Sequence, residues 1–309
     1  MKFVVVGAGG VGGYFGGKLA MKGEDVWFVA RGQHLAAMQQ KGLRIEDGDQ
    51  TFVIPPGRMV ATPDEAGKAD VILFCVKSYD TETAASSLSG IVTSDSIVLC
   101  LQNGVDNEEK IQKVLPKAVI FGGASYIYAT ITAPGVITRP GGPKRIVFGP
   151  INGEDPRSSA LRDTMRNAGV DVRLTNDVTA ALWTKFIFIS AVGGVTAMTR
   201  LTLGELLSVP ETRDLLQGAM KETESIARAL RVNVQENVIE KMFETLKSME
   251  TNTYSSMYHD LVNGKPIEVE AFSGVLLRYG EQLGIPTPIH RTVYAALLPY
   301  HLKHLRKRE

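Results

Sequence analysis

One lysine stands inside an otherwise apolar run and could act as a proton donor. Lys185 lies in the run LWTKFIFI, residues 182–189, with apolar side chains before and after it. Apolar surroundings partly desolvate an ammonium group, which lowers its pKa toward a value that suits acid–base catalysis. The alternative is a lysine whose stem lies along a buried helix while its ammonium reaches water.

Two polar positions near the end of the chain could belong to the same site. Ser256 lies in a Ser-Ser-Met run, and Glu268 stands between Ile267 and Val269. Both precede a helical pattern. The competing interpretation is a helix cap and a solvated acid, because serine is a common cap and glutamate is usually exposed.

A glycine-rich loop near the start of the chain has the pattern of a dinucleotide-binding loop. The sequence GAGGVG spans residues 7–12 and directly follows the apolar run 2–6. Its first glycine permits a tight turn, its second lets the backbone approach a pyrophosphate, and its third permits close packing of helix on strand. The N-terminus of the following helix offers free N–H groups to phosphates. The alternative is a glycine-rich turn without a ligand.

The residue at the end of the next predicted strand bears on the choice of nucleotide. A site for NAD has an Asp or Glu about 20 residues after the loop, where it binds the ribose 2′-hydroxyl. Here no acid ends the strand, and Arg31 stands in its place. A guanidinium suits a 2′-phosphate, so the sequence predicts NADP(H). The alternative is a solvated surface arginine.

Two more candidates follow buried strands. Lys77 comes after the run 71–76, and Asn103 comes after the run 97–101. In open α/β sheets, ligands lie outside the carboxyl ends of the strands, so both residues should border the same crevice. Taken alone, each also fits a surface charge or an ordinary turn.

The elements that position these residues change character along the chain. Strands are predicted over 2–6, 25–30, 71–76 and 97–101, with a hairpin around 47–49 and further strands between 119 and 148. Strands that alternate with helices indicate a parallel sheet, here a Rossmann-type α/β domain over residues 1–176. From residue 177 to 309 apolar residues recur at helical spacing, which predicts an all-helical substrate and catalytic domain. One predicted helix face contains Leu215, Ala219, Ile226 and Leu230.

Composition and charge exclude several classes of protein. The 309 residues include 34 Lys and Arg against 33 Asp and Glu, and this net charge of +1 gives no basic face for nucleic acid. A hydrophobic share of 44% excludes a disordered chain. The two cysteines stand in apolar runs without a Cys/His cluster, so we expect no metal site. The longest uncharged stretch, 118–138, is predicted as short strands. We therefore expect a cytoplasmic protein without nucleic-acid or membrane partners.

Together these motifs resemble those of the ketopantoate reductases (2-dehydropantoate 2-reductases). The resemblance covers essentially the whole length and includes GAGGVG, Val76-Lys77, Gln102-Asn103-Gly104, Trp183-Thr184-Lys185, Ser255-Ser256-Met257 and Ile267-Glu268. It implies a two-domain, NADPH-dependent oxidoreductase. The implied reaction is reduction of 2-dehydropantoate to pantoate, a step of pantothenate and coenzyme A biosynthesis.

The resemblance also implies roles for single residues. Lys185 matches the catalytic lysine, and Glu268 matches the acid that works beside it and contacts the cofactor. Asn103, Lys185 and Ser256 are implied to bind the substrate, Ser256 through the substrate carboxylate. The implied cofactor-binding residues are Gly7, Gly9, Gly10, Val11, Gly12, Arg31, Lys77, Asn103 and Glu268.

One departure from the family pattern leaves the substrate open. Members commonly carry asparagine one and two turns after the lysine, where this chain has Ile189 and Gly193. We expect a more apolar pocket wall with free space at Gly193, which fits either 2-dehydropantoate or another, more apolar 2-oxo acid. A third hypothesis is a non-catalytic NADP(H)-sensing protein, against which the retained Lys185 argues. The amphipathic pattern over 211–230 fits either a homodimer interface or the core.

Overall fold

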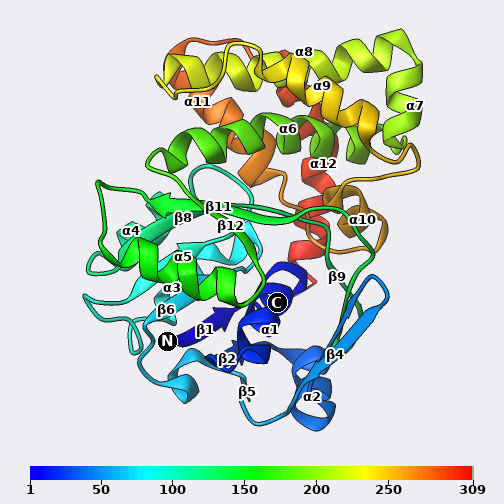
Figure 1. Ribbon diagram of the computed structural model, residues 1–309. Coiled ribbons are helices and arrows are strands. Elements are labelled where there is room, and N and C mark those ends of the chain that lie inside the picture. The colour runs from blue at the N-terminus through cyan, green and yellow to red at the C-terminus, as the bar shows by residue number, and fades with distance from the viewer. Residues whose placement is uncertain (308–309) are drawn as a thin grey trace. The chain divides into compact units, whose positions relative to one another are not determined.

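The computed structural model describes residues 1–307, which form two compact units (Figure 1). The first unit is Met1–Ala181 and contains two β-sheets; the second begins at Leu182 and is built of helices. The predicted fold class, an α/β region followed by a helical one, is therefore confirmed. The division between the units falls inside helix α6 (Val178–Thr199), whereas the predicted domain boundary precedes that helix.

The larger sheet of the first unit has eight strands in the order β12-β11-β8-β7-β6-β1-β2-β5. Six of them run parallel, β11 is antiparallel to β8, and β12 is parallel to β11. The strands are β1 (Lys2–Val6), β2 (Asp25–Val29), β5 (Met59–Val60), β6 (Val71–Phe74), β7 (Ile97–Cys100), β8 (Val119–Ile127), β11 (Lys144–Pro150) and β12 (Asp171–Leu174).

Both faces of this sheet are covered, which explains its continuous apolar strands. Along β1, Phe3 and Val5 belong to one hydrophobic core, while Val4 and Val6 belong to another. Successive side chains of a strand point to opposite faces, so each face needs its own apolar residues. The strand order reverses at β1, which pairs with β2 on one side and with β6 on the other. A ligand crevice is expected at the carboxyl ends of strands at such a point.

A second sheet of four strands, in the order β4-β3-β10-β9, lies in the same unit. Its strands are β3 (Leu43–Asp47), β4 (Gln50–Ile54), β9 (Thr130–Ala133) and β10 (Val136–Arg139). The predicted hairpin is confirmed, because β3 and β4 are antiparallel and Asp47 pairs with Gln50. The parallel pairing of β3 with β10 was not predicted, since strands so far apart in the sequence leave no local signal of their pairing.

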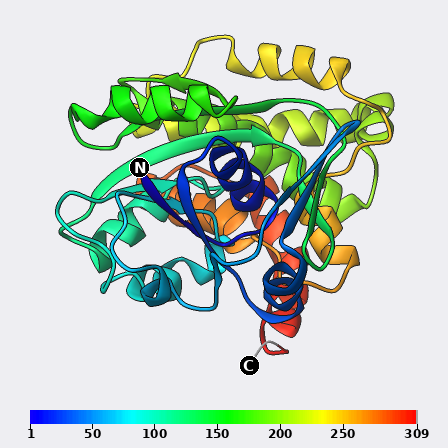
Figure 2. The same cartoon turned by 60° about the horizontal axis from the view of Figure 1, so that its bottom comes forward.

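Helix α1 (Gly10–Met21) packs against both sheets, as Figure 2 shows. A Cβ added at Gly16 would lie 2.6 Å from a methyl group of Val5 in the large sheet. A Cβ at Gly17 would lie 2.2 Å from Ile45 in the small sheet. Glycines on two faces of the helix thus permit close approach on both sides. The other helices of this unit are α2 (Gly32–Lys41), η1 (Pro63–Ala66), η2 (Ser78–Asp80), α3 (Thr81–Ser86), α4 (Asn107–Val114) and α5 (Arg157–Asn167).

The second unit is helical, as predicted, with one π-helical turn. After α6 come α7 (Leu203–Ser208), α8 (Pro210–Ala229), α9 (Val238–Ser248), α10 (Ser256–Val262), the π-turn η3 (Glu270–Gly274), α11 (Val275–Leu283) and α12 (Pro288–Leu305). By length and composition α6 could cross a membrane, but 61% of its most apolar window is buried inside the protein. Among its side chains, Phe186, Ile187 and Val195 are fully buried.

The predicted face of α8 is correct in its middle and wrong at its end. Ala219 and Ile226 are fully buried, and Leu216, one position from the predicted Leu215, is also buried. Leu230 is 37% exposed, because α8 ends at Ala229 and the helical spacing no longer applies beyond it.

Candidate active site

The glycine loop has the backbone geometry that its sequence predicts. Gly7 has φ +94°, and a Cβ there would lie 2.8 Å from the backbone nitrogen of Val76. A Cβ at Gly12 would lie 2.3 Å from the carbonyl oxygen of Gly7. A Cβ at Gly9, in contrast, would meet nothing within 4 Å. Packing inside the protein thus requires glycine at positions 7 and 12. Gly9 has no such packing contact and leaves open space beside the loop.

The start of α1 completes an anion-binding arrangement. Gly9 is the N-cap and offers no side-chain cap, and the first turn, which includes Gly10 and Val11, contains no acid. Uncapped N–H groups and the positive end of the helix dipole favour a phosphate. A Cβ at Gly10 would lie 2.0 Å from the carbonyl oxygen of Ala129, so this glycine also lets the β8–β9 connection pack on the loop. The loop therefore fits a dinucleotide pyrophosphate.

Arg31 follows β2 and lies on the same sheet edge as the glycine loop. Its side chain is 76% exposed, and its Nη2 donates a hydrogen bond of 2.6 Å to Oδ2 of Asp80. Asp80 ends the short helix η2, which follows β6. No sequence pattern indicates this partner, because the pairing joins segments after two different strands that only the sheet brings together.

Lys77 and Asn103 follow the carboxyl ends of β6 and β7, which are parallel neighbours. The buried side chain of Gln102 joins the two loops by donating to the carbonyl oxygen of Val76 at 3.0 Å and to Oγ1 of Thr81 at 2.9 Å. The carbonyl oxygen of Asn103 accepts a hydrogen bond of 2.9 Å from Nδ2 of Asn107. Lys77 and Asn103 thus lie at the sheet edge that carries the glycine loop; their contacts with a ligand stay predictions.

His34 supports the glycine loop, a role that no sequence pattern indicates. Its Nε2 donates to the carbonyl oxygen of Ala8 at 2.9 Å, and its Nδ1 accepts from the backbone N–H of Gly135 at 3.0 Å. Burial lowers the pKa of His34, which agrees with a neutral imidazole that donates through one nitrogen and accepts through the other. One side chain thus fastens the loop to the turn before β10.

In the helical unit, Lys185 is buried on α6, with 9% exposure. The neighbouring aromatic rings form a chain of edge-to-face contacts: Trp183 with Phe186 at 5.7 Å, and Phe186 with Phe272 at 5.9 Å between ring centroids. Phe272 donates its backbone N–H to the carbonyl oxygen of Glu268 at 3.1 Å. The segment that carries Glu268, itself 5% exposed, therefore packs against the part of α6 that carries Lys185.

The expectation of free space at Gly193 is wrong. A Cβ there would lie 2.9 Å from Cε2 of Phe272 and 3.8 Å from Cε of Met257. The ring of Phe272 occupies the place of a side chain at this position. This ring and Ile189, one turn away on α6, are both apolar; that they form the wall of a substrate pocket stays a prediction.

Ser256 is exposed and begins α10, next to the buried Met257. The preceding Ser255 is the N-cap, and its Oγ accepts from the backbone N–H of Tyr258 at 3.1 Å. Oγ1 of the buried Thr196 lies 2.6 Å from Oγ of Ser255 and also donates to the carbonyl oxygen of Val192. Thr196 therefore ties the start of α10 to α6, so the segments of Lys185, Glu268 and Ser256 all pack on one helix.

A buried polar network, which no sequence pattern indicates either, holds these helices together. His290 is 1% exposed; Nε2 donates to the carbonyl oxygen of Ala219 at 3.0 Å, and Nδ1 accepts from the hydroxyl of Ser273 at 3.2 Å. Thr223 lies 3.0 Å from the same Nε2 and 3.2 Å from the hydroxyl of Ser190 on α6. Burial lowers the pKa of His290 to about 4, so the imidazole is neutral.

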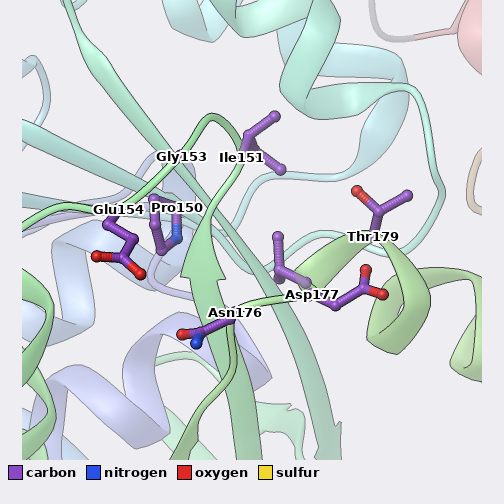
Figure 3. A pocket seen from close by; sticks show the side chains of 8 residues that line it. Pro150, Ile151, Gly153, Glu154, Asn176, Asp177 and Thr179 are labelled. Atoms are coloured by element: carbon purple, nitrogen blue, oxygen red, sulfur yellow. The ribbon is translucent and has the colours of Figure 1, made fainter. Parts of the chain in front are cut away.

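A separate pocket of about 360 Å³ lies elsewhere in the first unit (Figure 3). It is lined by Pro150, Ile151, Gly153, Glu154, Asn176, Asp177, Val178 and Thr179. These residues lie at or just after the carboxyl ends of β11 and β12, which run opposite to the six parallel strands. The pocket is thus at the opposite edge of the sheet from the glycine loop. Its Asp177 already caps α6 by accepting the N–H of Ala180 at 3.0 Å.

Comparisons with known proteins agree over both units. The family model "Ketopantoate reductase PanE/ApbA" matches residues 3–153, and its C-terminal counterpart matches residues 177–301. A 2-dehydropantoate 2-reductase of Pyrococcus abyssi is 31% identical over 305 residues, covering 96% of this chain and 97% of the relative. The uncharacterized oxidoreductase YkpB of Bacillus subtilis is 30% identical over 301 residues, covering 97% of this chain and 99% of the relative. The crystal structure of a PanE/ApbA family ketopantoate reductase from Ralstonia eutropha has a TM-score of 0.91 and 31% identity, covering 99% of this chain and 100% of that one.

Proposed function

Because this chain belongs to the ketopantoate reductase family, whose members are NADP-dependent oxidoreductases, we propose that it reduces 2-dehydropantoate to pantoate. This would place it in pantothenate biosynthesis. The observation that carries the proposal is the buried Lys185, which lies on the helix against which the segments of Glu268 and Ser256 pack.

The first unit holds the cofactor in this proposal. The loop from Gly7 to Gly12 and the first turn of α1 bind the pyrophosphate, and the guanidinium of Arg31 binds the 2′-phosphate. Lys77 and Asn103 border the same crevice. When bound, NADPH supplies the hydride that the C2 carbonyl of the substrate accepts.

The helical unit supplies the acid. Negative charge develops on the carbonyl oxygen of the substrate, where the Lys185 ammonium stabilises it and donates a proton. Glu268 orients Lys185 or the cofactor, and Ser256 binds the carboxylate of the substrate. A buried ammonium is effective here because a charge in apolar surroundings acts on a developing anion with little screening by water.

A second candidate substrate is a more apolar 2-oxo acid. The observation that favours it is the Phe272 ring, which fills the space at Gly193 and offers no hydrogen bond there. Ile189 likewise offers none, and the family carries amides at both positions. A lost hydrogen bond to a polar substrate group costs about 0.5–1.5 kcal/mol unless another group replaces it.

The decisive experiment measures NADPH oxidation with purified protein and a panel of 2-oxo acids. We expect the highest kcat/KM with 2-dehydropantoate, with pantoate identified as the product. A higher kcat/KM with 2-oxoisocaproate or phenylpyruvate would favour the apolar alternative. Oxidation with none of them would contradict both. Cytoplasmic location, the absence of nucleic-acid and membrane partners, and a homodimer stay predictions; light scattering after gel filtration tests the last.

A further inference from the structure

An ion pair crosses the edge of the sheet where the glycine loop lies. Arg31 follows β2 and Asp80 ends η2 after β6, and the strands β2 and β6 flank β1 on either side. The 2.6 Å contact between Nη2 of Arg31 and Oδ2 of Asp80 therefore joins the two sides of the crevice above the carboxyl end of β1. The glycine loop begins at that end, with Gly7.

The two partners differ in exposure. The Arg31 side chain is 76% exposed, while the Asp80 side chain is 22% exposed. The acid is therefore the more buried partner, and the guanidinium lies against it at the surface. Among residues 1–307, Arg31 forms no other ion pair, so its orientation depends on this one contact.

An acid in this position opposes the binding of a second anion by Arg31. At close contact the carboxylate offsets much of the attraction that the guanidinium exerts on a phosphate, and two anions beside one cation repel each other. A 2′-phosphate must displace Asp80 or share Arg31 with it. A ribose with a free 2′-hydroxyl carries no such charge and is affected little.

We propose that Asp80 determines nucleotide specificity, competing with the 2′-phosphate for Arg31 and thereby limiting the preference for NADPH over NADH. This inference rests on the proposed role of Arg31. It predicts that removing the charge of Asp80 strengthens binding of ligands with a 2′-phosphate and leaves ligands without one nearly unchanged.

The test uses two adenosine probes that lack the nicotinamide, so that binding is measured without turnover. Calorimetric titration of the whole protein with adenosine 2′,5′-bisphosphate and with adenosine 5′-monophosphate gives the two affinities. Asp80→Asn should bind the bisphosphate about three- to fivefold more tightly, the upper part of the range expected for an exposed ion pair, and the monophosphate equally. The gain should fall as salt rises.

The matched control is Asp163→Asn, which removes an equal charge from an exposed ion pair on α5. It should change neither affinity. Combining Asp80→Asn with Arg31→Ala should abolish the gain, because the competition needs the guanidinium. Asp80→Ser serves if the amide variant has a lowered melting temperature.

The outcomes distinguish the inference about Asp80 from the proposed role of Arg31. Unchanged or weaker binding of the bisphosphate by Asp80→Asn would overturn the inference and show that the acid only orients Arg31. A bisphosphate-to-monophosphate ratio that Arg31→Ala leaves unaltered would instead overturn the proposed role of Arg31 itself.

Discussion

The two units prepare for chemistry in different ways. In the first, the ligand-facing geometry is made by backbone and glycines: Gly7 and Gly12 are fixed by contacts under 3 Å that a Cβ would make, and Gly9 leaves open space. In the second unit, the candidate chemical groups are side chains, and Lys185 and Glu268 are both buried. The segments that carry them are held by aromatic contacts and by hydrogen bonds of hydroxyl and imidazole groups.

This difference has a chemical reason. A pyrophosphate is bound well by backbone N–H groups at a helix N-terminus, so the protein needs only to bring its backbone close. Proton donation needs one titratable group held at one place, which requires a packed and hydrogen-bonded surrounding. Substitutions should therefore act by steric exclusion in the first unit and by loss of a specific group in the second.

The largest expected effect is loss of the proton donor. Lys185→Ala should lower kcat by about 10²–10⁴, the usual contribution of a positioned acid or base, while the Kd for NADPH changes little. Steady-state kinetics and fluorescence titration measure the two quantities. Lys221→Ala, at an exposed position on α8, is the control and should retain full activity. Normal turnover by Lys185→Ala would show that the lysine is structural.

The next effect concerns acid stability of the helical unit. The pKa of His290 is lowered by burial from 6.5 to about 4 in the folded protein, so the unfolded chain binds the proton more readily. The contribution of His290 to the free energy of unfolding should therefore be fully present above pH 6.5. The free energy of unfolding should fall by roughly 3 kcal/mol as the pH drops from 6.5 to 4.

Urea unfolding followed by circular dichroism at pH 7, 5.5 and 4.5 measures this dependence. His290→Gln removes the titration, so its stability should be lower at pH 7 and decline less steeply with acid. Equal slopes for the two proteins would mean that His290 is not the group responsible. The pKa of His34 is also lowered, so its titration contributes equally to the pH dependence of stability in the parent and in His290→Gln.

A pair of glycine substitutions tests the steric account of the first unit. Gly12→Ala should lower the free energy of unfolding by about 1–3 kcal/mol, because the methyl group would lie 2.3 Å from the Gly7 carbonyl oxygen. Gly9→Ala meets nothing within 4 Å, so its melting temperature should stay unchanged while NADPH binding weakens. Calorimetry measures the stability of both variants, and titration with NADPH measures their affinity for the cofactor. Full NADPH affinity in Gly9→Ala would mean that the open space is not the ligand's.

The smallest effect is expected at the apolar wall. Gly193→Ala should cost about 1 kcal/mol net, because contact with the Phe272 ring outweighs the better helix propensity of alanine. Adding Phe272→Leu should recover part of that loss. Thermal melts of the single and double variants measure the coupling. A Gly193→Ala protein more stable than the parent would show that the ring moves aside freely.

Local patterns predicted much of this molecule. The strand, glycine loop and helix at 2–21, the hairpin at 43–54 and the helical second half all follow from spacing and turn residues. Local patterns did not predict three other features: the pairing of β3 with β10, the Arg31–Asp80 contact and the His290 network. Each of these joins segments that are far apart in the sequence. The space at Gly193 was predicted wrongly, since a glycine does not reveal which neighbour fills the place of its missing side chain.

The small sheet joins segments that are far apart in the sequence, which has a consequence for folding during synthesis. Arg139 of β10 contacts Asp47 of β3 across 92 positions, and Gly135 contacts His34 across 101. Before the ribosome has released the chain through β10, the small sheet is incomplete and does not cover its side of α1. At that stage His34 also lacks its hydrogen bond from Gly135, so it does not hold Ala8 in place. Contacts so distant in sequence slow folding. A nascent chain shorter than about 140 residues should therefore bind no nucleotide, however complete its glycine motif.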